Sequence, residues 1–318
     1  MLILGEVHTG LLLNSTSLPP AGCEGALGLF RGETVRRSER PIAHAASPDL
    51  LTGVDCRLAT ASGARVRGVG TVLHRATITG GRVLQGSAVA RLAEGEASHR
   101  LPWSHYLARP GRVEMIGGTD WADLARGFVT GPPAASTPTA APTLDLGAIS
   151  GRVMDAVQAS PFVDRSPPFR APRTRLQWVA VTTSDDADRI AFRIESEQVR
   201  TLRLRCTVGE ADTVGGFCED LALHDWLLTT LLAMIERSRI GGESRAHTVE
   251  RLRPAIDHLL HLWMPAARVS QDLLELWDFL ERWPGFSRQW RVSVDRIRDQ
   301  ISASTIALLS GGAAGNGR

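Results

Sequence analysis

Two strand-like segments joined by a pair of glycines constrain the fold of this chain more than any other feature. The segments are Ala64–Ile78 and Arg82–Leu92, and Gly80-Gly81 lies between them. Both segments are rich in valine and other residues that favour strands, and adjacent glycines supply the positive φ angles of a tight hairpin turn. The pattern predicts two long antiparallel strands, so the N-terminal part of the chain is expected to contain a β-sheet.

An uncharged run separates this part from the rest of the 318-residue chain. Residues 131–143 read GPPAASTPTAAPT, a mixture of Pro, Ala, Ser and Thr without hydrophobic periodicity. Such runs are typical of semi-extended linkers. We therefore expect a β-rich domain at residues 1–130, a linker at 131–143 and a second domain at 144–309. The small residues that dominate 310–318 predict a disordered tail.

The second part of the chain begins its sheet with three short segments that alternate polar and apolar residues. They are Leu176–Thr183, Arg189–Glu195 and Val199–Val208. The links between them are short and polar, which favours an antiparallel meander, in which each strand pairs with the next.

The remainder of the second part has helical periodicity. Residues Glu219–Arg237 are apolar around most of their circumference, which indicates a helix inside a core. The segments Pro254–Trp263, Ser270–Trp283 and Ser287–Leu309 each carry an apolar stripe, and together they predict a helical bundle. The expected fold class is α+β. An antiparallel β-rich N-terminal domain, with barrel and sandwich both left open, precedes a C-terminal domain with a small antiparallel meander followed by a helical bundle.

The chain contains no lysine, since all 36 basic residues are arginine. A codon bias toward G and C explains this usage, but its chemical consequence is sharp. No residue can form a Schiff base with pyridoxal phosphate, and no Walker-type or kinase-type lysine can reach a nucleotide phosphate. The net charge is only +2, so the composition does not indicate a nucleic-acid partner.

Cysteine usage and hydropathy favour a soluble, cytoplasmic protein. The four cysteines show no Cys-x-x-Cys spacing, so reduced thiols are expected rather than a disulfide framework. No export signal is recognisable, and the apolar run Trp226–Ile235 is too short to cross a bilayer. We expect no membrane association.

The sequence contains only weak signals of catalytic or metal-binding residues. His258 and His261 form a His-x-x-His pair, but the apolar stripe of their helix faces the other way, so both imidazoles are expected on the solvent side. His224 and Asp225 are adjacent on a helix and point about 100° apart, so one is expected to be buried and the other exposed. The sequence predicts no catalytic residue, no cofactor and no metal site.

A cluster of tryptophans in the helical region is the strongest functional signal. Trp263, Trp277 and Trp290 lie on apolar stripes and are expected in the core. Trp283 ends its helix beside Pro284-Gly285-Phe286, so it is less strongly expected to be a core residue. Aromatic residues flanked by arginine are typical of interface hot spots. The predicted partner-binding residues are Trp283, Arg282, Arg288 and Phe286.

Three stretches resemble a family of actinobacterial proteins of about this length. They are MLILGEVHTGLL at the N-terminus, SERPIAHAASPDLLTGVDCRL at Ser38–Leu58 and LPWSHYLARPG at Leu101–Gly111. That family has no assigned activity, and no site residue can be carried over from it. The resemblance implies a component of a multi-protein system, because family members are encoded near a variant P-loop protein and a methyltransferase-like protein.

Two functions follow as hypotheses. The first is a non-enzymatic adaptor or scaffold that docks a partner protein through its C-terminal helices; the oligomeric state stays open. The alternative is an enzyme or small-molecule binder with its site in the cleft between the two domains. A deep pocket with converging polar groups, such as His44, His74, His105 or Asp55, would favour the alternative.

Overall fold

A single open sheet of ten strands forms the centre of the protein in the computed structural model, which describes residues 1–30, 32–131, 142–182, 189–238 and 245–315. The strand order is β2-β3-β5-β7-β6-β1-β8-β10-β9, and β4 pairs with β5 beside β3. The expected α+β class and mostly antiparallel pairing are confirmed, whereas the sheet is neither a barrel nor a sandwich. The strands are β1 (Leu2–Leu11), β2 (Arg36–Ser38), β3 (His44–Ala46), β4 (Leu50–Leu58), β5 (Val66–Thr79), β6 (Val83–Glu94), β7 (Arg112–Ile116), β8 (Thr174–Thr182), β9 (Ile190–Ile194) and β10 (Val199–Cys206).

The glycine hairpin is confirmed as the join between β5 and β6. Gly80 and Gly81 have φ angles of 58° and 63°, and the Arg82 N–H closes the turn on the Thr79 carbonyl at 3.0 Å. Two positive φ angles match the right-handed twist of the flanking strands. Toward the other end of the hairpin the two strands diverge, and β7 fills the gap, antiparallel to β5 and parallel to β6.

Strand β1 joins the two parts of the chain into this sheet. It pairs antiparallel with β6 on one side and with β8 on the other. Its near-continuous burial is that of a central strand covered on both faces: Ile3 and Val7 enter one hydrophobic core, and Leu2 and Leu4 enter another. Segments 1–130 and 144–309 therefore share one sheet. Most of the expected linker, 132–141, lies outside the described residues.

The order of the last three strands corrects the expected meander. Strand β10 lies between β8 and β9, parallel to β8 and antiparallel to β9. The burial of the side chains of β9 and β10 agrees with these positions in the sheet. Leu202, Leu204 and Cys206 of β10 are almost completely buried, as a central strand requires, whereas Ile194 of β9 is exposed. The longer strand, β10, takes the interior position, and the shorter β9 becomes the edge.

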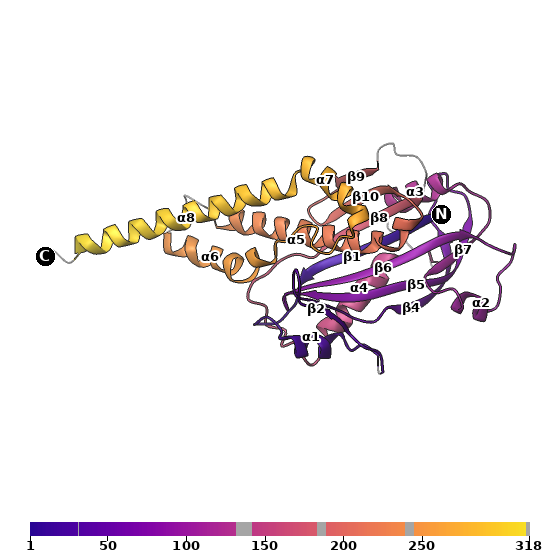
Figure 1. The fold of residues 1–318 in the computed structure, drawn as a ribbon, viewed down its shortest axis with the longest axis horizontal. Helices are drawn as coiled ribbons and strands as arrows, with labels where there is room; N and C mark the ends of the chain where they lie inside the picture. Colours follow the sequence, from indigo (N-terminus) through magenta and orange to yellow (C-terminus); the bar gives the residue numbers. More distant parts are fainter. Residues whose placement is uncertain (31, 132–141, 183–188, 239–244, 316–318) are drawn as a thin grey trace.

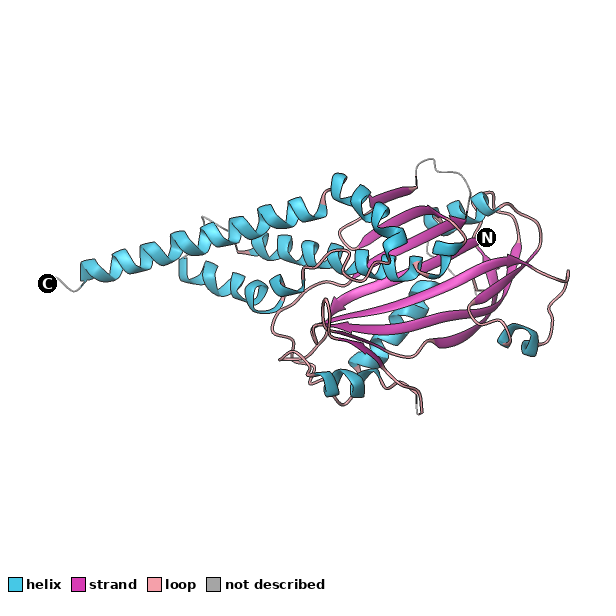
Figure 2. Ribbon diagram, in the orientation of Figure 1, coloured by secondary structure: helices cyan, strands magenta, loops and turns pink. Residues whose placement is uncertain are grey.

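Helices cover both faces of the sheet (Figures 1 and 2). Helix α4 crosses one face and packs on β1, β5 and β6, with α1 and α3 on the same side. Helix α5 lies on the opposite face against β1, β6 and β8, and the later helices cover it in turn. The helices are α1 (Pro20–Leu27), α2 (Trp103–Leu107), α3 (Trp121–Thr130), α4 (Leu146–Gln158), α5 (Val214–Arg237), α6 (Arg245–His258), α7 (Leu274–Arg282) and α8 (Phe286–Gly315).

Helices α5, α6 and α8 lie side by side and extend beyond the sheet, and α8 projects furthest (Figure 1). Two expected boundaries were wrong. Helix α6 begins at Arg245 and contains Pro254 in its interior, although the sequence placed Pro254 at a helix start. Helix α8 continues to Gly315, past the expected end at 309, because extending an existing helix fixes few additional angles per hydrogen bond. No helix in the described part of the chain combines the length and the apolar character of a bilayer span.

Candidate functional site

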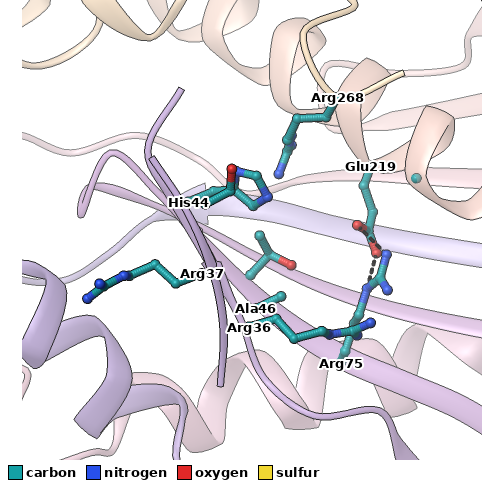
Figure 3. A pocket seen from close by; sticks show the side chains of 10 residues that line it. Arg36, Arg37, His44, Ala46, Arg75, Glu219 and Arg268 are labelled. Carbon is teal, nitrogen blue, oxygen red and sulfur yellow. Dashed lines mark hydrogen bonds and ion pairs between the residues drawn. The ribbon is translucent and has the colours of Figure 1, made fainter. Parts of the chain in front are cut away.

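A pocket of about 330 Å³ lies between the strands β2, β3 and β5 and the first turns of helix α5. The segment that connects α6 to α7 closes it from a further side through Arg268 (Figure 3). Its charged lining consists of Arg36, Arg37, Arg75 and Arg268 with a single acid, Glu219, and His44 is its one histidine. The pocket therefore lies between segments 1–130 and 144–309, where the alternative hypothesis expected a site.

Strand pairing brings these side chains to one place. Arg36 of β2 pairs with Ala46 of β3, and His44 of β3 pairs with Thr79 of β5. Along β5, side chains alternate between the two faces. Ala76 enters the core on the α4 side, so Arg75 projects toward α5.

Arg75 and Glu219 form a bidentate ion pair across the pocket wall. Arg75 donates from Nε to Oε1 at 2.9 Å and from Nη2 to Oε2 at 2.8 Å, and Ser87 donates its hydroxyl to Oε1 at 2.6 Å. Burial opposes a charge on Glu219, but Arg75, Ser87 and Arg268 outweigh it, and they hold the pKa of this carboxyl below its ordinary value. Glu219 is therefore a fixed anion that orients Arg75.

A second buried acid holds Arg268 at the pocket. Asp220 follows Glu219 on α5, and its carboxylate accepts hydrogen bonds from Arg268 Nε at 3.5 Å and from the Ala266 N–H at 3.0 Å. Arg268 also donates from Nη2 to Gln85 at 3.2 Å. Because Asp220 is completely buried, these bonds anchor the segment before α7 to the middle of the protein.

The same polar network reaches the tryptophan cluster. His224 donates from Nδ1 to the Asp220 carbonyl at 2.7 Å, and its Nε2 accepts the Met264 N–H at 3.3 Å. Its ring meets Trp263 and Trp277 edge-on, at centroid distances of 5.0 and 5.6 Å. The residues that line the pocket and the helices that cover α5 are thus parts of one packed unit.

His44 contributes a titratable group. Its Nδ1 lies 3.1 Å from the Ile42 carbonyl, which can only accept, so Nδ1 carries the proton and Nε2 is the basic nitrogen of the neutral ring. Burial lowers the pKa of His44, and the positive charges of Arg268 and Arg75 add to this effect. The ring is accordingly neutral at pH 7.

Two arginines keep donors for a ligand. Arg75 is committed to Glu219 and, at 3.6 Å, to Asp49. Arg36 uses only Nη2, on Asp49, and Arg268 uses Nε and Nη2. Within the described part of the chain, Nη1 of both Arg36 and Arg268 has no partner, and Figure 3 shows Arg268 extending toward His44.

Gly216 lines the pocket from the first turn of α5. A Cβ built on Gly216 would meet no other atom within 4 Å, so this part of the helix opens onto free space. The N-terminus of a long helix carries a partial positive charge, which adds to the field of the arginines. Helix α5 has no side-chain cap at this end.

A smaller pocket of about 150 Å³ adjoins the first. The two share Arg75, Gly216 and Glu219 in their walls. The smaller one reaches Trp178 and Val89 on the sheet, which add apolar surface next to the arginines, and its lining also includes Asp49, Arg91 and Asp212.

The four polar residues considered for a cleft separate into two groups. His44 lines the main pocket and His74 lines the smaller one, where it is hydrogen-bonded to Thr52 at 3.0 Å. His105 instead pairs with Glu114 at 2.8 Å, and Asp55 pairs with Arg67 at 2.7 Å, and neither lines these two pockets. Two of the four residues therefore line the pockets, and two do not.

The predicted partner-binding residues lie around the corner between α7 and α8. Trp283 is 74% exposed, and Arg282 and Arg288 are also exposed. Phe286 is a correction, because it is buried and packs against Trp277 and Phe192. The turn at Pro284-Gly285 directs Phe286 into the core. Phe286 therefore stabilises the corner and offers no surface to a partner.

The remaining candidates are placed as follows. Both His224 and Asp225 are buried, contrary to expectation, because α5 packs between the sheet and the later helices and Arg200 of β10 pairs with Asp225 at 3.0 Å. His258 is half-buried against Phe169, and His261 is exposed in the turn after α6. Among the described residues, no three His, Cys, Asp or Glu side chains gather around a possible metal position.

All four cysteines are buried and free. Burial raises the pKa of Cys23 to about 11 and that of Cys56 to about 12. A thiol needs access and a thiolate to act as a nucleophile, so these two are held in the unreactive form.

Sequence reasoning missed the arginines of the pocket. Arginine replaces lysine throughout the chain, so no single arginine stands out from the rest. One signal was present: Glu219 is a charge in a helix that is apolar on most sides, and such a residue requires a buried partner.

Comparison with known proteins adds no family to this description. No protein-family model, no curated protein and no solved structure matches the chain.

Proposed function

We propose that this protein binds a small anionic ligand in the pocket between β2, β3, β5 and α5. One observation carries the proposal: guanidinium groups from three separate segments converge on a pocket whose lining includes one acid, and that acid is already neutralised by Arg75. The pocket volume of about 330 Å³ falls in the range of small-molecule sites.

Arginine suits this role better than its abundance alone would suggest. A guanidinium group stays charged at all physiological pH values and presents several donors in a fixed plane. Partial burial strengthens its interaction with an anion, because less water competes. Arg268 is only 10% exposed, and its orientation is fixed by Asp220 and Gln85, so little side-chain freedom is lost on binding.

Thermal unfolding tests the proposal. A bound anion stabilises the native state, so sodium phosphate should raise the melting temperature above that in sodium chloride of equal ionic strength. Phosphate also stabilises proteins without a specific site. The diagnostic variant is therefore Arg36→Met, which should lose the specific part of the increase. Arg298→Met removes a comparable exposed arginine on α8 and should keep it. Equal increases in all three proteins would refute a site at Arg36.

Partner docking at the corner between α7 and α8 is the second candidate. It is favoured by the 74% exposure of Trp283 on a corner where Phe279 is also exposed, at 41%. Large exposed indoles with adjacent arginines are typical of hot spots. In this proposal the protein is an adaptor in a multi-protein system, and a P-loop protein or a methyltransferase-like protein is the partner that the family resemblance suggests.

A further inference from the structure

We infer that the ligand of this pocket carries a phosphate monoester group, held between Arg36 and Arg268 and facing His44. The inference rests on the proposed anion-binding function and specifies the ligand. It depends on the directions from which the cations approach, on the space beside them, and on the one histidine that lines the pocket.

The cationic groups approach from different sides. Arg36 belongs to β2 at one edge, Arg75 to β5 in the floor, and Arg268 to the segment before α7 on the opposite side (Figure 3). A planar carboxylate is best matched by a single guanidinium fork. A phosphate group instead presents three acceptor oxygens in a tetrahedral arrangement, so it can accept from several directions at once.

The space is larger than an inorganic anion needs. The smaller pocket continues from the shared wall at Arg75 and Gly216 toward Trp178 and Val89. A phosphate bound at Arg36 and Arg268 would leave this second space for the organic group to which the phosphate is esterified. A small ester with an apolar or aromatic body fits this division.

His44 gives the pocket a means of matching the second charge of a phosphate. The charged groups around it are Arg36 from β2, Arg75 from β5, Glu219 from α5 and Arg268 from the segment before α7, and Asp49 and Asp220 pair with Arg36 and Arg268. Arg37 extends away from His44 and pairs with Glu24. Each of the three arginines already pairs with an acid, but burial and the positive charges of Arg268 and Arg75 still disfavour a positive charge on the ring. A doubly charged anion between Arg36 and Arg268 reverses that balance.

A proton should therefore enter with the ligand. Above the second pKa of the ester, which is about 6, the free phosphate is a dianion. Nε2 of His44 then takes one proton from solvent, and the complex contains an imidazolium beside the dianion. A sulfate ester has one negative charge fewer at the same pH, so it stabilises the imidazolium form of His44 less and should cause less proton uptake.

Calorimetric titration of the full chain with phenyl phosphate and phenyl sulfate tests the inference. Each titration is made in buffers of different ionisation enthalpy, between about pH 6 and about pH 8, on either side of the ordinary histidine pKa. We expect uptake of close to one proton with phenyl phosphate near pH 7.5, an affinity that strengthens as the pH falls toward 6.5, and roughly tenfold weaker binding of phenyl sulfate, the equivalent of about one pKa unit.

The variant His44→Gln separates the possible outcomes. Glutamine can still donate to the Ile42 carbonyl but cannot titrate, so proton uptake should disappear while binding weakens. If both esters bind equally well without proton uptake, the pocket binds anions but the phosphate inference is wrong. If neither ester binds the wild-type protein, the proposed function fails with it.

Discussion

Arg75 of β5 and Glu219 of α5 face each other through two nearly parallel hydrogen bonds of 2.9 and 2.8 Å. The two residues are 144 positions apart in the sequence, and their pairing attaches the first turns of α5 to the sheet. Glu219 is almost completely buried; Ser87 donates to its carboxylate, and Gln85 donates from Nε2 to its main-chain carbonyl at 2.8 Å. The pair therefore fixes both the wall of the pocket and the position of α5.

Replacing Glu219 with glutamine should remove the bidentate partner of the partly buried Arg75 and leave it only the more distant Asp49, at 3.6 Å. Breaking a buried ion pair on one side costs roughly 3–5 kcal/mol, so the free energy of unfolding should fall by an amount of this order. Chemical denaturation at pH 7 measures it. The control is Asp257→Asn, which breaks the exposed pair with Arg253 and should change the stability by less than about 1 kcal/mol. Similar losses in both variants would contradict the account.

Glu219→Gln should also change how the free energy of unfolding depends on pH in acid. The pKa of Glu219 is lower in the folded protein than its ordinary value of 4.5. The folded state thus binds its proton less readily than the unfolded state, and the stabilisation is present above pH 4.5 and is lost as the pH falls through the folded-state pKa. Glu219→Gln should therefore flatten the loss of stability below pH 4.5 compared with the wild-type protein.

Local chemistry predicted the parts of the fold that depend on neighbouring residues. Gly80 and Gly81 identified the β5–β6 hairpin because a turn of this kind needs two positive φ angles within a few residues. Asp145 is a residue type that often precedes a helix, and its carboxylate accepts the Ala148 N–H at the start of α4. The buried positions of Trp277 and Trp290 followed from helical spacing.

Features that depend on contacts between distant segments of the chain could not be predicted from neighbouring residues. The parallel placement of β10 beside β8 depends on which strand competes best for the sheet interior, and the order of strands along the chain does not reveal it. The pocket is a similar case, since Arg36, Arg75 and Arg268 come from three distant segments. Their convergence is a property of the assembled sheet and of Asp220 beneath the segment before α7.

The sharing of one sheet by both parts of the chain leads to a prediction about cleavage. Insertion of a protease recognition sequence within residues 132–141 allows the chain to be cleaved between segments 1–130 and 144–309. Because β1 pairs with β8, and α4 packs beneath β1, β5 and β6, the two fragments should elute together from a sizing column after cutting. Separate elution of two folded fragments would instead support independent domains at 1–130 and 144–309.

The tryptophans of the helical layer should respond very differently to truncation. Trp290 is 7% exposed and stacks on Trp263 at a centroid distance of 4.2 Å, so Trp290→Ala should cost roughly 3–5 kcal/mol. Trp283→Ala should leave the melting temperature nearly unchanged, because its side chain is largely in solvent.

Partner capture from the native host distinguishes the second candidate function. A stoichiometric partner that is retained by the wild-type protein and lost with Trp283→Ala, at unchanged melting temperature, would support docking at this corner. A hot spot contributes about 2 kcal/mol or more, which is enough to remove a partner of moderate affinity. If Trp283→Ala destabilises the protein as much as Trp290→Ala, the residue is structural and this proposal fails.

The most direct test of the pocket is to fill it from Gly216. A leucine there extends from a position with no other atom within 4 Å of its Cβ, and it favours the helix relative to glycine, so the fold should be retained. Gly151 of α4 is a matched control, since it is also helical with open space around its Cβ and lies on the other face of the sheet. In calorimetric titration with phenyl phosphate, the account predicts that Gly216→Leu abolishes binding and that Gly151→Leu binds like the wild-type protein. Unchanged binding by a folded Gly216→Leu protein would contradict it.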